Sequence, residues 1–189
     1  MALGPPSDDE LRALLAELHG SELTYPDPGR TLSGLPLPAG YHHTGATGDL
    51  GRGGAAWDAA REGLRGWQAH RGAGLRVVPA RPPVAVGTEV VTDVAAAGPV
   101  HVLAACRIVA VVDEADRFGF AYGTLRVHPA RGEEAFVVER GPGGAVRMVV
   151  TAFSRPNGLL MRLGGPVVRR RQAAAARAYV EALRRHVAG

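Results

Sequence analysis

The chain has 189 residues, of which 46% are apolar and 21% charged, with a formal net charge of +4. This composition excludes a disordered or fibrous protein and fits one globular domain. All 22 of the Lys+Arg residues are arginine, which excludes chemistry that needs a lysine amine, such as Schiff-base catalysis, pyridoxal attachment or a phosphate-binding loop.

A single cysteine, Cys106, cannot form an internal disulfide, so a reducing, cytoplasmic location is expected. The N-terminal segment lacks the basic start and apolar core of a signal peptide. The longest apolar stretch, residues 100–112, is interrupted by His101 and Arg107 and is too short to cross a bilayer. We therefore expect no transmembrane segment.

The N-terminal segment carries a helix signal. Ser7 and Glu10 have the spacing of a capping box, and the leucines that follow recur on one helical face until Gly20. We expect residues 1–22 to form an N-terminal helical extension and residues 23–189 to form a single domain.

Prolines and glycines are frequent from residue 21 to residue 40 and predict an ordered wrap or a linker. Residues 41–50 fit a first strand. Apolar residues that include Trp57 and Trp67 then mark one face of a helix from about Gly53 to His70.

Six short β-rich runs follow, separated by turn signals. The gaps between them are short enough to join neighbouring antiparallel strands, and the segment 141–144, Gly-Pro-Gly-Gly, is a strong hairpin signal. The predicted strands are residues 75–78, 88–94, 100–112, 118–125, 135–140 and 145–153.

The C-terminal part returns to a helical pattern, with apolar residues on one face from Leu159 to Val187. A helix from about Pro166 to Val187 spans roughly 33 Å, enough to cross a sheet. The sequence thus predicts an α+β fold in which a curved antiparallel sheet of six to seven strands grips a long C-terminal helix.

This order of elements resembles the helix-grip fold of the START-like superfamily, which includes lipid carriers, plant hormone receptors and polyketide cyclases or aromatases. Short motifs give a closer match. They are Gly40-Tyr-His-His43, Gly51-Arg-Gly53, Trp67-Gln-Ala-His70, Val111-Val-Asp-Glu114, Phe118-Gly-Phe-Ala-Tyr-Gly-Thr-Leu125, His128-Pro129, Gly132-Glu-Glu-Ala-Phe136 and Ala152-Phe-Ser-Arg-Pro156. From about Leu23 to the C-terminus the chain is similar to a family of bacterial and plant proteins described only as a domain of unknown function. The resemblance implies a fold and a pocket but no reaction.

Alternation along the strand at 118–125 places Phe118, Phe120, Tyr122 and Thr124 on one face. This aromatic ladder either lines a cavity, with the Tyr122 hydroxyl and Thr124 as polar contacts, or forms a closely packed core. Both interpretations stay open at this point.

Polar residues lie in and after the next loop. His128, Glu133 and Glu134 either orient a ligand and act as acid and base, or are a turn histidine and solvated carboxylates. Glu133 and Glu134 cannot both face inward in a strand. The resembled family usually has Pro-Gly where this chain has Arg126-Val127, so we expect a reshaped turn before His128.

Other candidate ligand contacts come from separate segments. His43 is expected to hydrogen-bond in the pocket, Trp67 and Phe136 to add aromatic contacts, and Arg155 either to clamp an anionic group or to form an ion pair. On a strand, His42 and His43 point to opposite faces and are a poor metal pair. No metal and no cofactor are expected.

We predict that the chain binds a small hydrophobic or amphipathic molecule between the sheet and the C-terminal helix, as a carrier or sensor. The alternative is a cofactor-independent cyclase, dehydratase or isomerase, in which His128 or Glu133 moves a proton and Tyr122 or Arg155 stabilises oxyanion charge. A third hypothesis is an adaptor that uses the arginine-rich last helix. The arginines of this helix fit a solvated outer face, so nucleic acid is not an expected partner. The oligomeric state stays open.

Overall fold

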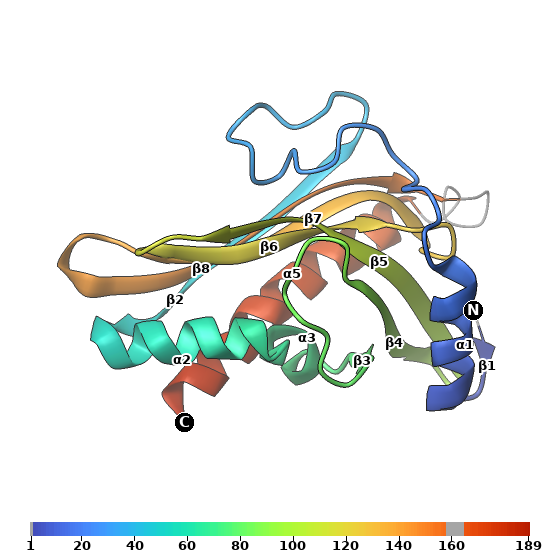
Figure 1. The fold of residues 1–189 in the computed structure, drawn as a ribbon, viewed down its shortest axis with the longest axis horizontal. Coiled ribbons are helices and arrows are strands. Elements are labelled where there is room, and N and C mark those ends of the chain that lie inside the picture. Colours follow the sequence, from blue (N-terminus) through green and yellow to red (C-terminus); the bar gives the residue numbers. More distant parts are fainter. Residues whose placement is uncertain (1, 158–164) are drawn as a thin grey trace.

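A computed structural model describes residues 2–157 and 165–189 and shows a curved antiparallel sheet covered on one face by helices. In Figure 1, α2, α3 and α5 lie beneath the sheet, and the connection from α1 to β2 crosses its opposite face.

Within the described residues, no helix is long and apolar enough to span a membrane. The expected helical positions Leu159, Leu160 and Leu163 lie outside the described residues. The helices are α1 (Asp8–Leu18), α2 (Gly53–Arg65), α3 (Gln68–Gly72) and α5 (Gly165–Ala188), with a 3-10 turn η1 (Pro142–Gly144).

The sheet confirms the predicted meander. Its spatial order in the described part of the chain is β2-β8-β7-β6-β5-β4-β3, with β1 paired to β5, and all neighbouring strands are antiparallel. The strand β7 begins at Ala130 rather than Ala135, which moves Glu133 and Glu134 from the predicted loop into the strand. The strands are β1 (Ala2–Leu3), β2 (His42–Arg52), β3 (Arg76–Val78), β4 (Glu89–Ala97), β5 (Val100–Asp113), β6 (Arg117–Thr124), β7 (Ala130–Arg140) and β8 (Ala145–Pro156).

The prediction of one helix from Gly53 to His70 is wrong, because the chain forms two. The helix α2 ends at Arg65, and Trp67 has a φ of 60°, a left-handed conformation that interrupts the helix before α3. Both helices turn apolar residues toward the same core, so the helical periodicity continues across the break and does not reveal it.

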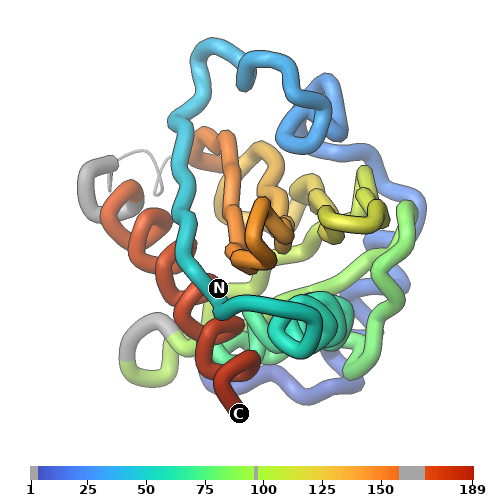
Figure 2. The backbone as a smooth tube through the Cα atoms, turned by 90° about the vertical axis from the view of Figure 1, so that its left-hand side faces the viewer, coloured from blue at the N-terminus to red at the C-terminus, as the bar shows by residue number. Residues whose placement is uncertain are grey.

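The long helix α5 packs closely along β2. Figure 2 shows the two elements side by side. A Cβ on Gly48 would lie 2.5 Å from Cγ1 of Val180, so the glycine is needed for the helix to approach the strand.

The opposite face of the sheet carries a second apolar cluster under α1. Ser7 and Glu10 form the predicted capping box, with the Glu10 N–H donating to Ser7 Oγ at 3.2 Å and the Ser7 N–H donating to Glu10 Oε2 at 2.7 Å. Leu11 and Leu18 are then buried against β3, β4 and β5. The assignment of residues 1–22 as a separate extension stays a prediction.

Candidate functional site

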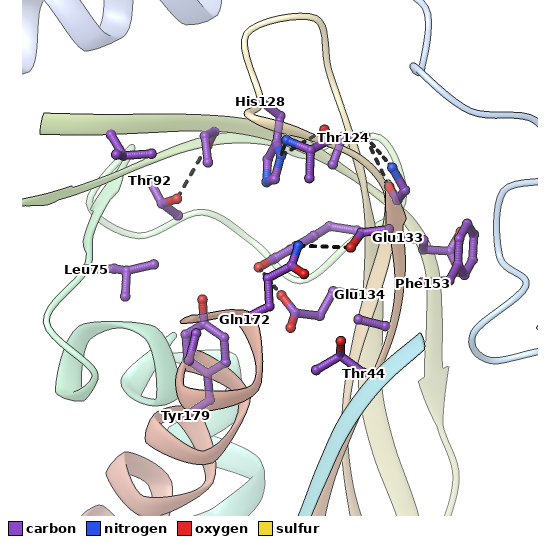
Figure 3. Close-up of a pocket in the computed structure, with 18 of the residues that line it drawn as sticks. Thr44, Leu75, Thr92, Thr124, His128, Glu133, Glu134, Phe153, Gln172 and Tyr179 are labelled. Carbon is purple, nitrogen blue, oxygen red and sulfur yellow. Dashed lines mark hydrogen bonds between the residues drawn. The ribbon is translucent and has the colours of Figure 1, made fainter. Parts of the chain in front are cut away.

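A cavity of about 200 Å³ lies between the inner face of the sheet and α5 (Figure 3). It starts at one row of paired residues that crosses four strands: Tyr122 on β6, Glu134 on β7, Ala152 on β8 and Thr44 on β2. The next row begins with Phe120 and is buried in the core beneath the helices. The end of that aromatic packing therefore defines where the cavity begins.

The helix α5 supplies the opposite wall. Gln172, Ala175 and Tyr179 are spaced by three and four residues and share one helical face, and the labelled side chains of Gln172 and Tyr179 point into the cavity in Figure 3. Gln172 Nε2 donates to Ser154 Oγ at 2.9 Å, which fixes the amide against β8. No hydrogen bond to the Gln172 carbonyl oxygen is found within the described residues, so this oxygen can accept one.

Glu134 places a carboxyl group in the cavity. The Tyr122 hydroxyl donates to Glu134 Oε2 at 3.0 Å, and no hydrogen bond to Oε1 is found within the described residues. Burial raises the pKa of Glu134 to about 7, against the opposing effect of the Tyr122 hydrogen bond. Burial also raises the pKa of Tyr122, so this hydroxyl stays protonated and donates.

His128 borders the cavity as a neutral ring. His128 Nδ1 lies 2.9 Å from the Ala130 backbone nitrogen and 3.0 Å from the Ala130 carbonyl oxygen, so the backbone of this one residue holds the ring. Burial lowers the pKa of His128 to about 4, which agrees with a neutral ring. The preceding turn is closed by the His128 N–H, which donates to the Leu125 carbonyl at 3.0 Å.

The rest of the cavity wall is mixed. Thr44 Oγ1 is buried without a hydrogen-bond partner among the described residues, whereas Thr92 Oγ1 donates weakly to the Ala104 carbonyl at 3.4 Å. Apolar side chains complete the wall, and they are Leu75, Val94, Val102, Ala104, Ala130, Ala152 and Ala175.

Thr124 borders the cavity, but its hydroxyl is already used. Thr124 Oγ1 donates to the Gly132 carbonyl at 3.1 Å, accepts from the Gly132 N–H at 2.9 Å and lies 2.5 Å from Thr24 Oγ1. Its hydrogen bonds join β6, β7 and the N-terminal connection. Thr124 therefore forms part of the cavity wall, but its hydroxyl is not available to a guest.

Glu133 is among the residues that border the cavity, but its carboxylate points to the opposite face of the sheet. Its carboxylate accepts from the Tyr25 hydroxyl at 2.6 Å, from the Gly29 N–H at 2.6 Å and from the Thr31 N–H at 2.7 Å. The Thr31 hydroxyl donates to it as well, at 2.5 Å. Glu133 therefore anchors the connection from α1 to β2 and is not placed to act on a guest in the cavity.

Four aromatic residues assigned to the ligand site lie in the packed core instead of the cavity wall. Phe118, Phe120, Phe136 and Trp67 are all buried, and the Trp67 and Phe120 rings lie 4.9 Å apart between centroids. Trp67 Nε1 donates to the Pro82 carbonyl at 3.1 Å. The aromatic ladder faces inward as predicted from alternation, but among its members only Tyr122 and Thr124 reach the cavity.

His43 and Arg155 also lie away from the cavity. His43 is exposed, with Nε2 2.9 Å from the Pro38 carbonyl oxygen. The exposed Arg155 guanidinium lies 4.9 Å from the centre of the Tyr41 ring. Neither side chain is among those that border the cavity. No group of three or more His, Cys, Asp or Glu residues within the described ranges is arranged to hold a metal ion.

Sequence reasoning did not assign Thr44, Thr92, Gln172 or Tyr179 to the cavity. The seven-residue spacing of Gln172 and Tyr179 on one helical face is a signal that the sequence does contain. The two threonines carry no comparable signal, because isolated hydroxyls on strands are common and their burial depends on what covers them.

The comparisons with known proteins agree with the sequence resemblance. A family model described as "Domain of unknown function (DUF1990)" matches residues 24–182. A UPF0548 protein of Deinococcus radiodurans is 34% identical over 193 residues, covering 96% of this chain and 96% of that protein. A UPF0548 protein of Arabidopsis thaliana is 32% identical over 145 residues, covering 73% of this chain and 69% of that protein.

Solved structures with low sequence identity share the fold. Human STARD10 matches with a TM-score of 0.53 and 13% identity, covering 97% of this chain and 80% of that chain. Ara h 8.0201 matches with a TM-score of 0.52 and 12% identity, covering 79% and 99%. A hypothetical protein from Helicobacter pylori matches with a TM-score of 0.58 and 9% identity, covering 77% and 88%. The predicted START-like helix-grip fold is confirmed.

Proposed function

The chain belongs to the DUF1990 family, and we propose that it binds a small amphipathic molecule in the cavity between the sheet and α5. The main support for this proposal is a cavity with mainly apolar walls that also contains polar groups without partners among the described residues. Thr44 Oγ1 and Glu134 Oε1 have no hydrogen-bond partner within the described residues. Because buried polar groups in proteins are almost always paired, a guest that supplies the missing partners is favoured.

The size of the cavity restricts the guest. Its volume of about 200 Å³ is below the usual range of ligand pockets, roughly 300–1,000 Å³. It is somewhat larger than an engineered apolar cavity of about 150 Å³ that binds benzene. We therefore expect a guest built on about one ring, not a long-chain lipid.

The likeness to STARD10 and Ara h 8.0201 supports a fold that can enclose such a cavity. It does not identify the guest, because one fold serves many ligands. The chemistry of the guest is argued from the side chains of this cavity.

The proposal is tested by native mass spectrometry of the purified protein and by thermal unfolding with a panel of one-ring probes. Ala175→Leu adds bulk to the cavity wall, and the control Ala174→Leu adds the same bulk on the exposed side of α5. Wild type and Ala174→Leu are expected to retain a small molecule or be stabilised by a probe, and Ala175→Leu is expected to lose both effects. Equal behaviour of the two variants, or no retained mass and no probe effect in wild type, contradicts the proposal.

A second candidate function is proton transfer on the same guest, as in a cofactor-independent cyclase, dehydratase or isomerase. The observation that favours it is Glu134, whose pKa of about 7 lies near the working pH and whose carboxyl is oriented by the Tyr122 hydroxyl. In this interpretation Glu134, and not Glu133, is the acid or base.

The enzyme hypothesis is tested with the retained molecule in D₂O. An enzyme that removes a proton next to a carbonyl incorporates deuterium there, which NMR detects, and Glu134→Gln abolishes the incorporation. Recovery of the molecule without deuterium and without chemical change after incubation with wild type leaves binding as the function.

A further inference from the structure

Among the described residues, the cavity contains an acid but no side-chain cation. Among the described residues that border it, no arginine is present, and Glu134 is the acidic residue whose carboxyl group lies inside. Glu133, the neighbouring acid, has its carboxylate on the other face of the sheet. A charged guest in this cavity therefore meets a single carboxylate.

From this arrangement we propose that the guest is a small organic cation, an ammonium group on a one-ring skeleton, whose nitrogen binds Glu134 Oε1. The inference rests on the proposed binding function and names the class of its ligand. An ammonium group has up to three N–H donors and no acceptor. It needs acceptors, and the cavity offers acceptors that are not in use.

Those acceptors lie around one space. Within the described residues Thr44 Oγ1 is buried without a partner, and no hydrogen bond to the Gln172 carbonyl oxygen is found, whereas the Gln172 amide nitrogen donates to Ser154. Glu134 and Thr44 belong to the same cross-strand row, and Ala152 between them is too small to fill the gap. Figure 3 shows Thr44, Glu134 and Gln172 directed toward this part of the cavity.

The titratable groups that face Glu134 supply no positive charge near neutral pH. Burial raises the pKa values of Cys106 from β5, Tyr122 from β6 and Tyr179 from α5, so all three are neutral. His128 is neutral because burial lowers its pKa to about 4.

On the other side of Glu134, the same row continues with Ala152 on β8 and then Thr44 on β2. Neither of these side chains titrates. An anionic guest therefore finds no counter-charge among the described residues that border the cavity, whereas a cation relieves the cost of burying the carboxylate.

The binding step has a defined proton balance. Near pH 7 part of the protein has a protonated Glu134 carboxyl group. When the ammonium ion binds, that carboxyl proton passes to the buffer, the guest keeps its own protons, and the carboxylate and ammonium form the pair. Binding therefore releases up to one proton, and the affinity rises with pH until Glu134 is fully ionised.

Isothermal titration calorimetry with three probes of similar size tests the inference: benzylamine, which is cationic at neutral pH, benzyl alcohol and benzoate. We expect benzylamine to bind wild type at pH 8 at least about tenfold more tightly than benzyl alcohol, as for a hydrogen bond to a charged group. Titrations near pH 7 in two buffers with different ionisation enthalpies are expected to show the released proton. Glu134→Gln is expected to remove the preference, and the exposed Glu114→Gln to keep it.

Tyr122→Phe gives a second test that keeps the carboxyl group. Loss of the hydroxyl donor removes the interaction that lowers the pKa of Glu134, so benzylamine binding at pH 7 is expected to weaken and to recover at higher pH. Binding of benzyl alcohol or benzoate as tight as that of benzylamine, or unchanged benzylamine binding in Glu134→Gln, overturns the cationic guest and leaves the cavity function standing. Failure of all three probes to bind, with no retained molecule in the native mass spectrum, overturns both.

Discussion

Glu133 and Glu134 are adjacent in β7, yet their carboxyl groups lie on opposite faces of the sheet and in opposite environments. The Glu133 carboxylate accepts four hydrogen bonds from Tyr25, Gly29 and Thr31, whereas within the described residues the Glu134 carboxyl group has one, from Tyr122. The alternation of a strand separates them. One acid is saturated by its own chain, and the other retains capacity for a guest.

Glu133→Ala is expected to detach the connection that covers the outer face of the sheet. The Tyr25 hydroxyl, the Gly29 N–H and two donors of Thr31 lose their acceptor. Because unpaired buried donors are costly, the free energy of unfolding is expected to fall by about 2–4 kcal/mol. Urea unfolding measures this loss, and hydrogen exchange is expected to rise at the amides of Gly29 and Thr31.

Glu134→Gln is the matched control on the neighbouring residue, and it leaves the Glu133 contacts in place. It is expected to preserve the slow exchange of the Gly29 and Thr31 amides. Equal exchange in wild type and Glu133→Ala would show that the carboxylate does not hold this segment.

Glu134 is expected to make stability fall as pH rises from about 5 to about 8. Its pKa is raised from 4.5 to about 7 on folding, so the folded state binds the proton more tightly than the unfolded state. The stabilisation is complete below the unfolded pKa and is lost as pH rises through the folded one, by up to roughly 3 kcal/mol. Glu134→Gln, which has no proton to lose, is expected to gain stability relative to wild type at pH 8 in urea unfolding. A difference between the two proteins that does not change between pH 5 and pH 8 would contradict this.

His70 is expected to make stability depend on pH in the opposite direction, so that stability falls in acid. Both its ring nitrogens are buried without partners among the described residues, its ring lies among those of Trp67, Phe136 and Tyr179, and burial lowers its pKa from 6.5 to about 3. The unfolded state therefore binds the proton more tightly, and stability is lost as pH falls from about 6.5 toward 3.

His70→Phe keeps an aromatic ring and removes the unpaired nitrogens. It is expected to raise the free energy of unfolding at pH 7 by about 1–2 kcal/mol and to make its decline in acid shallower. His128, whose pKa is also lowered, contributes in the same pH range in both proteins, so the difference between them isolates His70. A variant less stable than wild type at pH 7 would indicate that the histidine nitrogens have partners.

The arrangement of the sheet could be predicted from local patterns, whereas the position of the cavity could not. Alternation correctly placed the side chains of Phe118, Phe120 and Tyr122 on the inner face, because a strand has a side-chain period of two. Which of them border a cavity depends on how far the helices extend over the sheet. That is decided by the break at Trp67 and by the path of α5, which are tertiary features.

The roles of the two adjacent acids depended on where β7 begins. The predicted strand started at Ala135, and the preceding residues Gly132, Glu133 and Glu134 are of types depleted in strands. In the folded protein Tyr122 pairs with Glu134 and Gly123 with Glu133, which extends the strand and gives each acid its face. Pairing with a partner strand outweighed local propensity.

Gly123→Ala tests whether the outer connection needs the bare backbone of β6. A Cβ at Gly123 would lie 2.3 Å from the hydroxyl oxygen of Tyr25 and 2.9 Å from its Cζ, on the face where Tyr25 donates to Glu133. The methyl group is expected to displace the tyrosine and to lower the free energy of unfolding by about 1–3 kcal/mol, the usual cost of overpacking.

Gly54→Ala is the control, at a helical position with no atom within 4 Å of the new Cβ. Its free energy of unfolding is expected to stay unchanged or to rise by up to about 1 kcal/mol. Because Gly123→Ala and Glu133→Ala disrupt the same contact, their double variant is expected to lose less stability than the sum of the single losses. Additive losses would mean that Gly123 is needed for a reason other than the approach of Tyr25 to Glu133.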